Sequence, residues 1–163
     1  MADWDREAGI TLSIVDRLTD FEPDSKLEGR SSSWEDMRAL KAAVCRDLAA
    51  LFNTRRAEQD FDKGYEQATH SLLTFGVADF TSFNLMNSFE QERVRRSIEH
   101  AIRQFEPRLA RVTVSLEEPD SLRPVLRFQI DAMLRIGPNS EAVLFDATLY
   151  RDSRRIDVSG ANS

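Results

Sequence analysis

The sequence contains an acid and a guanidinium on either side of a proline, in the segment Glu106-Pro107-Arg108. In an extended segment, residues two apart point to the same side, so the two charged side chains project together. Pro107 restricts the backbone between them. Three interpretations fit this pattern: a clamp in which Glu106 accepts backbone N–H groups and Arg108 donates to carbonyls or a carboxylate, a solvated turn with ordinary charges, and a catalytic carboxylate.

Other residues with reactive side chains form no recognisable catalytic pattern. His70 and Ser71 are adjacent, so in a helix their side chains cannot form a base–nucleophile pair, and no nucleophile motif surrounds Ser71. Cys45 is the single cysteine, which excludes an intrachain disulfide and a cysteine-based zinc site. The chain has 2 histidines, too few for most histidine-rich metal sites. We therefore expect no metal and no cofactor.

The composition is typical of a single folded domain. The chain has 163 residues, 41% of them hydrophobic and 31% charged, and a formal net charge of −6. This length supports one hydrophobic core. No apolar run approaches the roughly 20 residues of a membrane-spanning helix, and the charged start of the chain does not resemble a signal peptide. We therefore expect a cytoplasmic protein.

The first element that positions these residues is an amphipathic helix that begins near Ser33. Apolar side chains recur in it every three or four residues and so share one face. They are Met37, Leu40, Val44, Leu48 and Leu51. Asn53 is expected to end this helix in the left-handed conformation, and residues 65–75 fit a second, short helix that ends at Gly76.

The next helix leads directly into the Glu106–Arg108 segment. Ser88 and Gln91 fit a capping box at its start, and Pro107 bars Glu106 from the α conformation, so the helix ends there. Its apolar stripe consists of Val94, Ile98, Ala101, Ile102 and Phe105. The opposite face mixes charges of both signs, which is typical of a solvated or partner-facing surface: Glu92, Arg93, Arg95, Arg96, Glu99, His100 and Arg103.

Three strands are expected after this helix, because apolar and polar residues alternate over three segments. The buried rows are Val112, Val114 and Leu116, then Leu126, Phe128, Ile130, Ala132, Leu134 and Ile136, then Val143, Phe145, Ala147 and Leu149. Short connections imply an antiparallel meander with one face in water. The sequence therefore predicts an α+β fold, with amphipathic helices packed on one face of a small antiparallel β-meander.

Both ends of the chain are expected to lie outside this domain. Residues 1–32 are interpreted as an N-terminal arm and linker, because a short apolar segment is followed by turn-forming residues. The apolar segment docks either on the domain or on a partner, and the pattern does not decide between them. Residues 33–151 are expected to form the domain and residues 152–163 a C-terminal tail.

Three stretches, taken in order and spacing, resemble one family. They are residues 51–56 (LFNTRR), 75–80 (FGVADF) and 98–109 (IEHAIRQFEPRL). The family is TssE, the baseplate subunit of the bacterial type VI secretion system, which is similar to the wedge proteins of contractile phage baseplates. The segment 13–20 (SIVDRLTD) resembles the family's N-terminal segment, and the resemblance covers about residues 10–151.

The resemblance implies a structural protein that performs no catalysis and reaches the membrane only through the assembled secretion complex. It implies contacts with the wedge subunits TssF and TssG, with the sheath proteins TssB and TssC, and with TssK, and an edge strand that starts the sheath. Glu106, Pro107 and Arg108 match the family's hallmark, which is regarded as important for integrity and assembly. We expect partner contacts at Ile14, Val15, Arg17, Leu18, Arg55, Arg56 and Arg151.

Two other functions compete with this one. Because members of the family have been labelled lysozyme-like, Glu106 is nominated as the acid of a glycan hydrolase, but no motif supplies the second carboxylate that a glycosidase requires. The basic patch of Arg93, Arg95 and Arg96 is nominated for nucleic-acid binding. The net charge of −6 and the absence of a groove-reading motif disfavour that second function.

Overall fold

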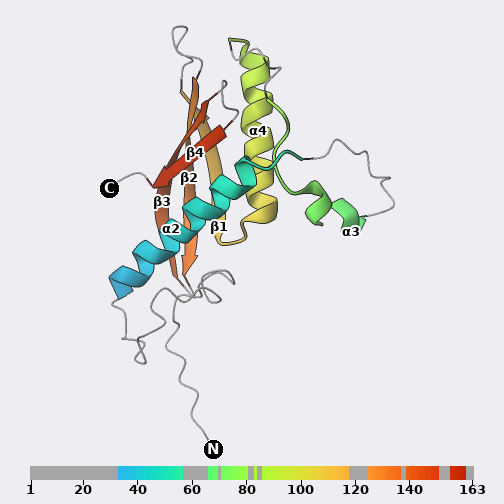
Figure 1. The fold of residues 1–163 in the computed structure, drawn as a ribbon. Helices are drawn as coiled ribbons and strands as arrows, with labels where there is room; N and C mark the ends of the chain where they lie inside the picture. Colours follow the sequence, from blue (N-terminus) through green and yellow to red (C-terminus); the bar gives the residue numbers. More distant parts are fainter. Residues whose placement is uncertain are drawn as a thin grey trace, which may run out of the picture.

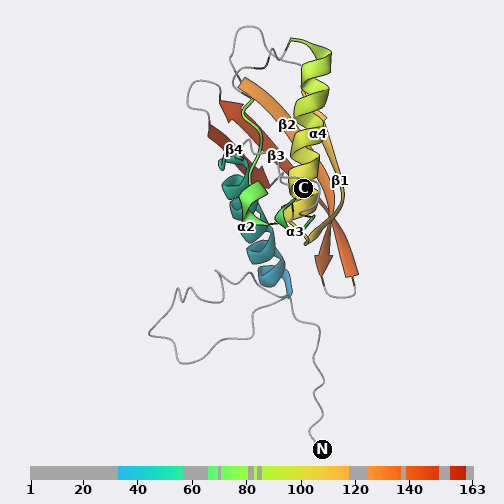
Figure 2. The same ribbon diagram turned by 90° about the vertical axis from the view of Figure 1, so that its right-hand side faces the viewer.

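The computed structural model describes residues 33–56, 66–69, 71–80, 83, 86–117, 125–136, 139–150 and 155–160. In chain order they form α2 (Ser33–Phe52), α3 (Glu66–Thr69), the 3-10 helix η1 (Leu72–Thr74), α4 (Ser88–Phe105), β1 (Leu109–Leu116), β2 (Val125–Ile136), β3 (Asn139–Tyr150) and β4 (Arg155–Gly160). Figures 1 and 2 show α2 and α4 on the same face of the sheet. The predicted α+β fold is confirmed.

The sheet is an antiparallel meander in the order β1-β2-β3-β4, with each strand paired to the next along the chain. β4 corrects the sequence analysis, which predicted a tail over residues 152–163. Ile156 is 3% exposed, and Val158 packs against the core. Two alternating apolar side chains in six residues are too weak a pattern to indicate a strand without the neighbour they pair with.

The core lies between the two long helices and one face of the sheet. All three predicted apolar rows of the sheet and both helical stripes point into it, so the interpretation of which faces are buried is confirmed. α4 packs over β1, while α2 packs over β4 at the other side of the sheet. Phe52 at the end of α2 contacts Phe128 of β2 edge to face, with 5.8 Å between ring centroids.

The start of α4 differs by one residue from the prediction. Asn87, and not Ser88, is the N-cap: its side-chain oxygen accepts a hydrogen bond of 2.9 Å from the backbone N–H of Phe89. Asparagine and serine are equally good N-caps, so the sequence alone does not choose between neighbours of these types. The predicted end is confirmed, because α4 stops at Phe105 and Glu106 is its C-cap.

The predicted single helix over residues 65–75 is wrong. The described part of this range forms the four-residue α3 and then η1. Between them, Ser71 donates its hydroxyl proton to the carbonyl of Ala68 at 2.7 Å and accepts from the N–H of Leu73 at 3.2 Å. A serine side chain that bonds to nearby backbone in this way competes with the helical ladder, which accounts for the break.

Gly76 allows the segment after η1 to approach the end of α2. The N–H of Val77 donates to the carbonyl of Thr54 at 3.0 Å, and the N–H of Arg56 donates to the carbonyl of Val77 at 2.9 Å. Gly76 has φ of +110°, and a Cβ at this position would lie 2.3 Å from the Thr54 oxygen. Both the backbone conformation and the close contact therefore require glycine.

β1 contains a bulge that changes which side chains face the core. Its register with β2 shifts between Ala110 and Thr113, and Arg111 has φ of +52°. Among the non-glycine residues that the structure describes, Arg111 alone has a positive φ, so the expected left-handed conformation of Asn53 is wrong. The extra residue lets both Leu109 and Val112 point inward although they are an odd number of positions apart.

Replacing Gly76 by alanine is expected to destabilise the protein by more than about 2 kcal/mol, because the methyl group is forced against the Thr54 carbonyl in a strained conformation. The matched control is Gly160→Ala, where the nearest atom to the new Cβ is the Cys45 sulfur at 4.0 Å. Urea denaturation followed by circular dichroism measures both. Equal midpoints for the two variants would contradict the expectation.

Candidate functional site

The Glu106 carboxylate lies buried at the junction between α4 and β1, where it binds Arg108 through both of its oxygens. Glu106 is 4% exposed. Nε of Arg108 donates to Oε1 at 2.7 Å and Nη2 donates to Oε2 at 2.5 Å, while the backbone N–H of Arg108 donates to Oε1 at 3.2 Å. Of the three interpretations of this segment, the burial and the pairing fit the clamp and do not fit a solvated turn.

Arg108 also connects the junction to two other elements. Its Nη2 donates to Oδ2 of Asp47 on α2 at 2.6 Å, and its carbonyl accepts from the N–H of Arg135 on β2 at 2.8 Å. The hydrogen bonds with Glu106, and then those with Asp47, raise the pKa of the Arg108 guanidinium above its ordinary value. The guanidinium therefore stays charged and joins α2 to the end of α4, while the backbone carbonyl of Arg108 bonds to the sheet.

The same geometry does not fit a general acid. Both oxygens of Glu106 are occupied, and the side chain is shielded from solvent, whereas a general acid must reach a substrate oxygen. One donor of the clamp is left over: Nη1 of Arg108 is buried and has no hydrogen-bond partner in the described part of the chain. That unpaired donor offsets part of the stabilisation that the clamp provides.

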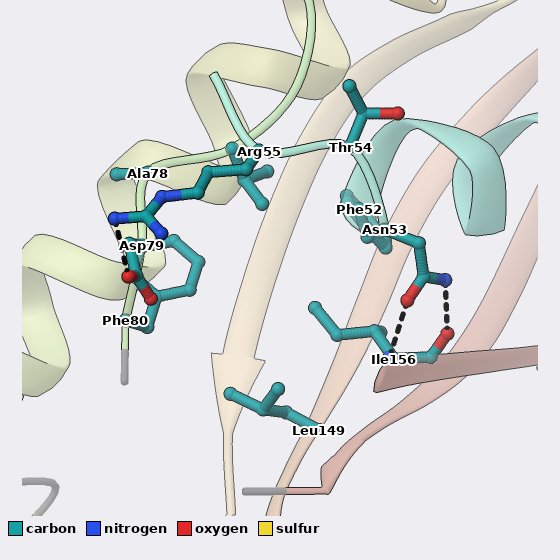
Figure 3. A pocket seen from close by; sticks show the side chains of 10 residues that line it. Phe52, Asn53, Thr54, Arg55, Ala78, Asp79, Phe80, Leu149 and Ile156 are labelled. Atoms are coloured by element: carbon teal, nitrogen blue, oxygen red, sulfur yellow. Dashed lines mark hydrogen bonds and ion pairs between the residues drawn. The ribbon is translucent and has the colours of Figure 1, made fainter. Parts of the chain in front are cut away.

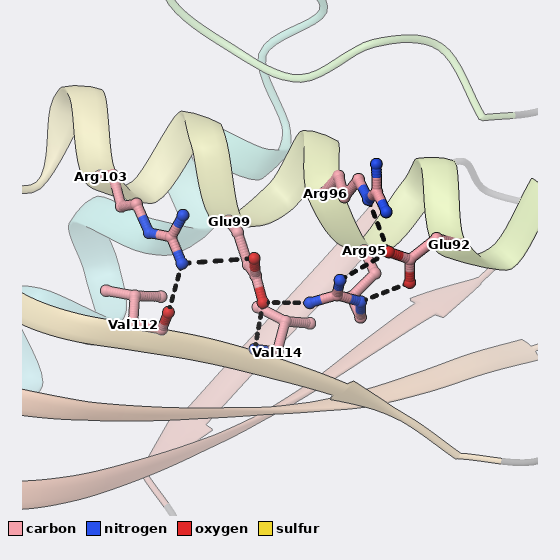
Figure 4. A network of polar contacts seen from close by, with 7 residues as sticks. All are labelled: Glu92, Arg95, Arg96, Glu99, Arg103, Val112 and Val114. Carbon is pink, nitrogen blue, oxygen red and sulfur yellow. Dashed lines mark hydrogen bonds and ion pairs between the residues drawn. The ribbon is translucent and has the colours of Figure 1, made fainter.

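The charged face of α4 carries a continuous network of ion pairs, drawn in Figure 4. Glu92 accepts from Nε and Nη2 of Arg95, both at 2.7 Å, and from Nε of Arg96 at 2.6 Å. The hydrogen bonds from Arg95 and then Arg96 lower the pKa of Glu92 to about 2. Arg93 stacks over the ring of Phe83. The predicted basic patch is thus engaged within the protein, which disfavours nucleic-acid binding.

Glu99 departs from the predicted solvated or partner-facing surface. It is 7% exposed and accepts from Nη1 of Arg95 at 2.5 Å. Its Oε1 also accepts from the backbone N–H of Val114 on β1 at 3.0 Å (Figure 4). Arg103, one helical turn further, donates to the carbonyl of Val112 at 2.9 Å. The charged face of α4 therefore turns toward the outer edge of β1.

Asn53 makes a similar contact at the other edge of the sheet. Figure 3 shows its side-chain amide facing the backbone of Ile156 on β4. Nδ2 donates to the Ile156 carbonyl at 2.7 Å, and Oδ1 accepts from the Ile156 N–H at 2.9 Å. Nδ2 also donates to the carbonyl of Ala49 at 2.7 Å, which ends α2. The amide thus bonds like a peptide unit of a neighbouring strand.

A pocket of about 190 Å³ opens beside this contact (Figure 3). An ion pair of 2.8 Å between Arg55 and Asp79 lies at the pocket, and the Arg55 side chain is 66% exposed. Arg56 is exposed next to it. The pocket is lined by Phe52, Asn53, Thr54, Arg55, Val77, Ala78, Asp79, Phe80, Leu149 and Ile156.

The other predicted residues do not join a common site. Ile14, Val15, Arg17, Leu18, His70 and Arg151 lie outside the described residues. Cys45 is partly buried against the core, and burial raises the pKa of its thiol, as expected for a packing residue. Within the described ranges, no group of three or more His, Cys, Asp or Glu residues is placed to hold a metal, and no helix is long and apolar enough to cross a membrane.

Sequence reasoning missed the roles of Asp47, Asn53 and Glu99. Asp47 is 61 positions from Arg108, so nothing local indicates their ion pair. Asn53 was expected only to end a helix, and its partner lies 103 positions away in a strand that was not predicted. For Glu99 one signal was present. Arg95 lies four residues before it and Arg103 four residues after it, so both can form ion pairs with it on the helix, as a buried carboxylate requires.

The chain is similar to baseplate proteins. The family model described as baseplate wedge protein gp25 matches residues 38–139, from α2 to the start of β3. A chain in the solved structure titled "The baseplate complex from the type VI secretion system" is 15% identical, with a TM-score of 0.48, over 79% of this chain and 99% of that chain. No curated protein matches the chain.

Replacing Arg108 by alanine is expected to destabilise the protein by about 1–3 kcal/mol, because it leaves the buried Glu106 without its cation. Arg127→Ala is the control, since Arg127 is exposed on the opposite face of the sheet. Urea denaturation gives the free energy of unfolding of both variants. If Arg108→Ala loses no more stability than Arg127→Ala, the clamp does not hold the junction together.

The ion pairs of Glu92 predict a specific dependence of stability on pH. The folded-state pKa of about 2 is below the ordinary value of 4.5, so ionised Glu92 stabilises the fold above pH 4.5, and this contribution disappears as the pH falls toward 2. The melting temperature of the wild type should therefore exceed that of Glu92→Gln at pH 7, and the difference should vanish near pH 2. Glu117→Gln, at an exposed position, should show no such difference; a gap that persists at pH 2 would contradict the assignment.

Proposed function

Because the chain belongs to the baseplate wedge protein gp25 family, we propose that it is a structural subunit of a type VI secretion baseplate wedge. The predicted family is confirmed by this membership, and a structural role in a baseplate follows from it. The match to the family over residues 38–139 is the observation that carries the proposal. The assignment to type VI secretion rests on the sequence blocks at residues 51–56, 75–80 and 98–109, which resemble TssE.

In this proposal the protein acts in the cytoplasm and performs no chemistry. Its partners are the wedge subunits TssF and TssG, the sheath proteins TssB and TssC, and TssK. The clamp of Glu106, Arg108 and Asp47 supports this role, since it fixes α2 and α4 relative to the sheet. A subunit that joins several partners gains affinity when its binding surfaces are rigid before they meet.

We further propose that β4 offers the edge at which the first sheath strand adds. Asn53 occupies the outward backbone groups of Ile156. Because these groups alternate along an antiparallel strand, those of Val158 and Gly160 point outward as well, and no hydrogen bond to them is found within the described residues. An exposed edge of this kind is suited to pairing with a strand of another chain.

Arg55 and Arg56 fit the same surface. Arg55 lines the pocket, as does Ile156 of β4 (Figure 3), and the exposed Arg56 follows Arg55 in the chain. Arg55 keeps 66% of its side chain exposed while it is paired with Asp79. This supports the prediction that both arginines contact a partner. The contacts predicted for Ile14, Val15, Arg17, Leu18 and Arg151 remain part of the proposal.

Coexpression with TssF and TssG tests the wedge role, and a proline in β4 tests the edge. Val158→Pro removes an N–H that β3 does not use, so the fold is expected to survive. The variant should copurify with TssF and TssG like the wild type but fail to start polymers of TssB and TssC. Val158→Thr, the matched control, should behave like the wild type in both assays.

The two readouts separate the two parts of the proposal. A wild-type protein that does not copurify with TssF and TssG contradicts the wedge role. A Val158→Pro protein that starts TssB–TssC polymers at the wild-type rate contradicts the role of the β4 edge and leaves the wedge role standing. Circular dichroism and thermal melting establish beforehand that both variants are folded.

A further inference from the structure

The outer edge of β1 is closed by side chains of α4. An added strand would present a carbonyl to the N–H of Val114 and an N–H to the carbonyl of Val112. Glu99 Oε1 takes the place of that carbonyl at 3.0 Å, and Nη2 of Arg103 takes the place of that N–H at 2.9 Å (Figure 4). The two side chains thus satisfy the backbone groups that a neighbouring strand would need.

The β1 edge is closed by a buried carboxylate, that of Glu99. Burying the charge of Glu99 is unfavourable unless it is paired and hydrogen-bonded. Arg95 supplies one partner at 2.5 Å and Arg103 a second at 3.4 Å. Glu92 holds Arg95 through two hydrogen bonds of 2.7 Å, which fixes the guanidinium that faces Glu99. The network is therefore arranged around the position of Glu99 on the β1 edge.

The β1 bulge acts at the same place. The register shift lies between Ala110 and Thr113, so it includes Val112, which Arg103 binds, and directly precedes Val114, which Glu99 binds. A bulge twists an edge and interrupts the ladder that a second strand would extend. β4 carries one such contact, that of Asn53 with Ile156. Two features that block pairing with another strand therefore coincide on β1. On β4, the strand beyond Ile156 remains available for such pairing.

We propose that Glu99 and Arg103 form an edge lock that makes this sheet one-sided. The lock prevents two copies of the chain from pairing β1 to β1 and so restricts strand addition to β4. The occupant that it excludes is a second copy of this chain, since the copies of a subunit gathered in one assembly meet at high local concentration. The statement about β4 and the choice of a second copy as the excluded occupant rest on the proposed function, whereas the closure of the β1 edge does not.

Substitutions of Glu99 test the lock. Glu99→Ala frees the N–H of Val114, while Glu99→Gln keeps an oxygen that can accept it, so the pair isolates the hydrogen bond from the charge. We expect Glu99→Ala to form dimers whose fraction rises with concentration in size-exclusion chromatography with light scattering. Glu99→Gln and the wild type should keep one mass. In dilute Glu99→Ala, the Val114 amide should exchange with solvent about tenfold faster.

Arg103→Met provides a second test that does not depend on the stability of Glu99→Ala. Arg103 is 61% exposed, and Arg95 still pairs with Glu99 after its removal, so this variant is expected to fold and to dimerise weakly. Arg96→Met is its control, because Arg96 is paired with Glu92 and, among the described residues, has no hydrogen bond or ion pair to β1. Folded, monomeric Glu99→Ala and Arg103→Met proteins at all concentrations would overturn the lock.

Adding Val158→Pro to Glu99→Ala identifies the edge that pairs. Dimers that persist in the double variant are formed through β1 and support the proposal. Dimers that disappear are formed through β4 and overturn it. This result is independent of sheath assembly. If Val158→Pro does not alter TssB–TssC polymers, the proposed function of β4 is contradicted, but the dimerisation test of β1 is unaffected.

Discussion

The ion pair between Glu106 and Arg108 lies where the chain passes from the helical layer into the sheet, and the arrangement of both layers depends on it. Pro107 ends α4 and directs the chain into β1, so the two layers are covalently joined at this point. A covalent joint sets no angle by itself. The angle is set by Arg108, whose guanidinium binds Glu106 at the end of α4 and Asp47 on α2, and whose backbone carbonyl accepts from the N–H of Arg135 on β2.

Each long helix has two separate functions in this fold. Its apolar stripe covers one face of the sheet, which supplies most of the free energy of packing. Its polar residues then reach past that face to the outer backbone of the nearest edge strand: Glu99 and Arg103 from α4 to β1, and Asn53 after α2 to β4. A small sheet with two exposed edges is prone to unwanted pairing with other chains. Side chains from the covering helices limit this pairing without any additional segment of chain to cover the edges.

The parts of the fold that the sequence predicts are those that depend on periodicity. The apolar stripes of both helices and the alternation in three strands follow from spacing within a short window, and each is confirmed. The parts that it misses depend on a partner far away. β4 has two inward apolar residues and becomes a strand because β3 lies beside it. Glu99 looks solvated on a helical wheel and is buried because β1 returns beneath it.

The same distinction explains why the charged residues were harder to interpret than the apolar ones. An apolar residue at the correct spacing has one plausible place, the core, whereas a charged residue is equally consistent with solvent, an ion pair, an edge or a catalytic site. Arg95 and Arg108 show the outcome. Arg95 binds Glu92 and Glu99 on its own helix, whereas Arg108 binds Glu106 and Asp47 and so joins the end of α4 to α2. In this protein, several charges that could have indicated nucleic-acid binding or hydrolysis instead position strands and helices, which is the chemistry that a rigid part of an assembly requires.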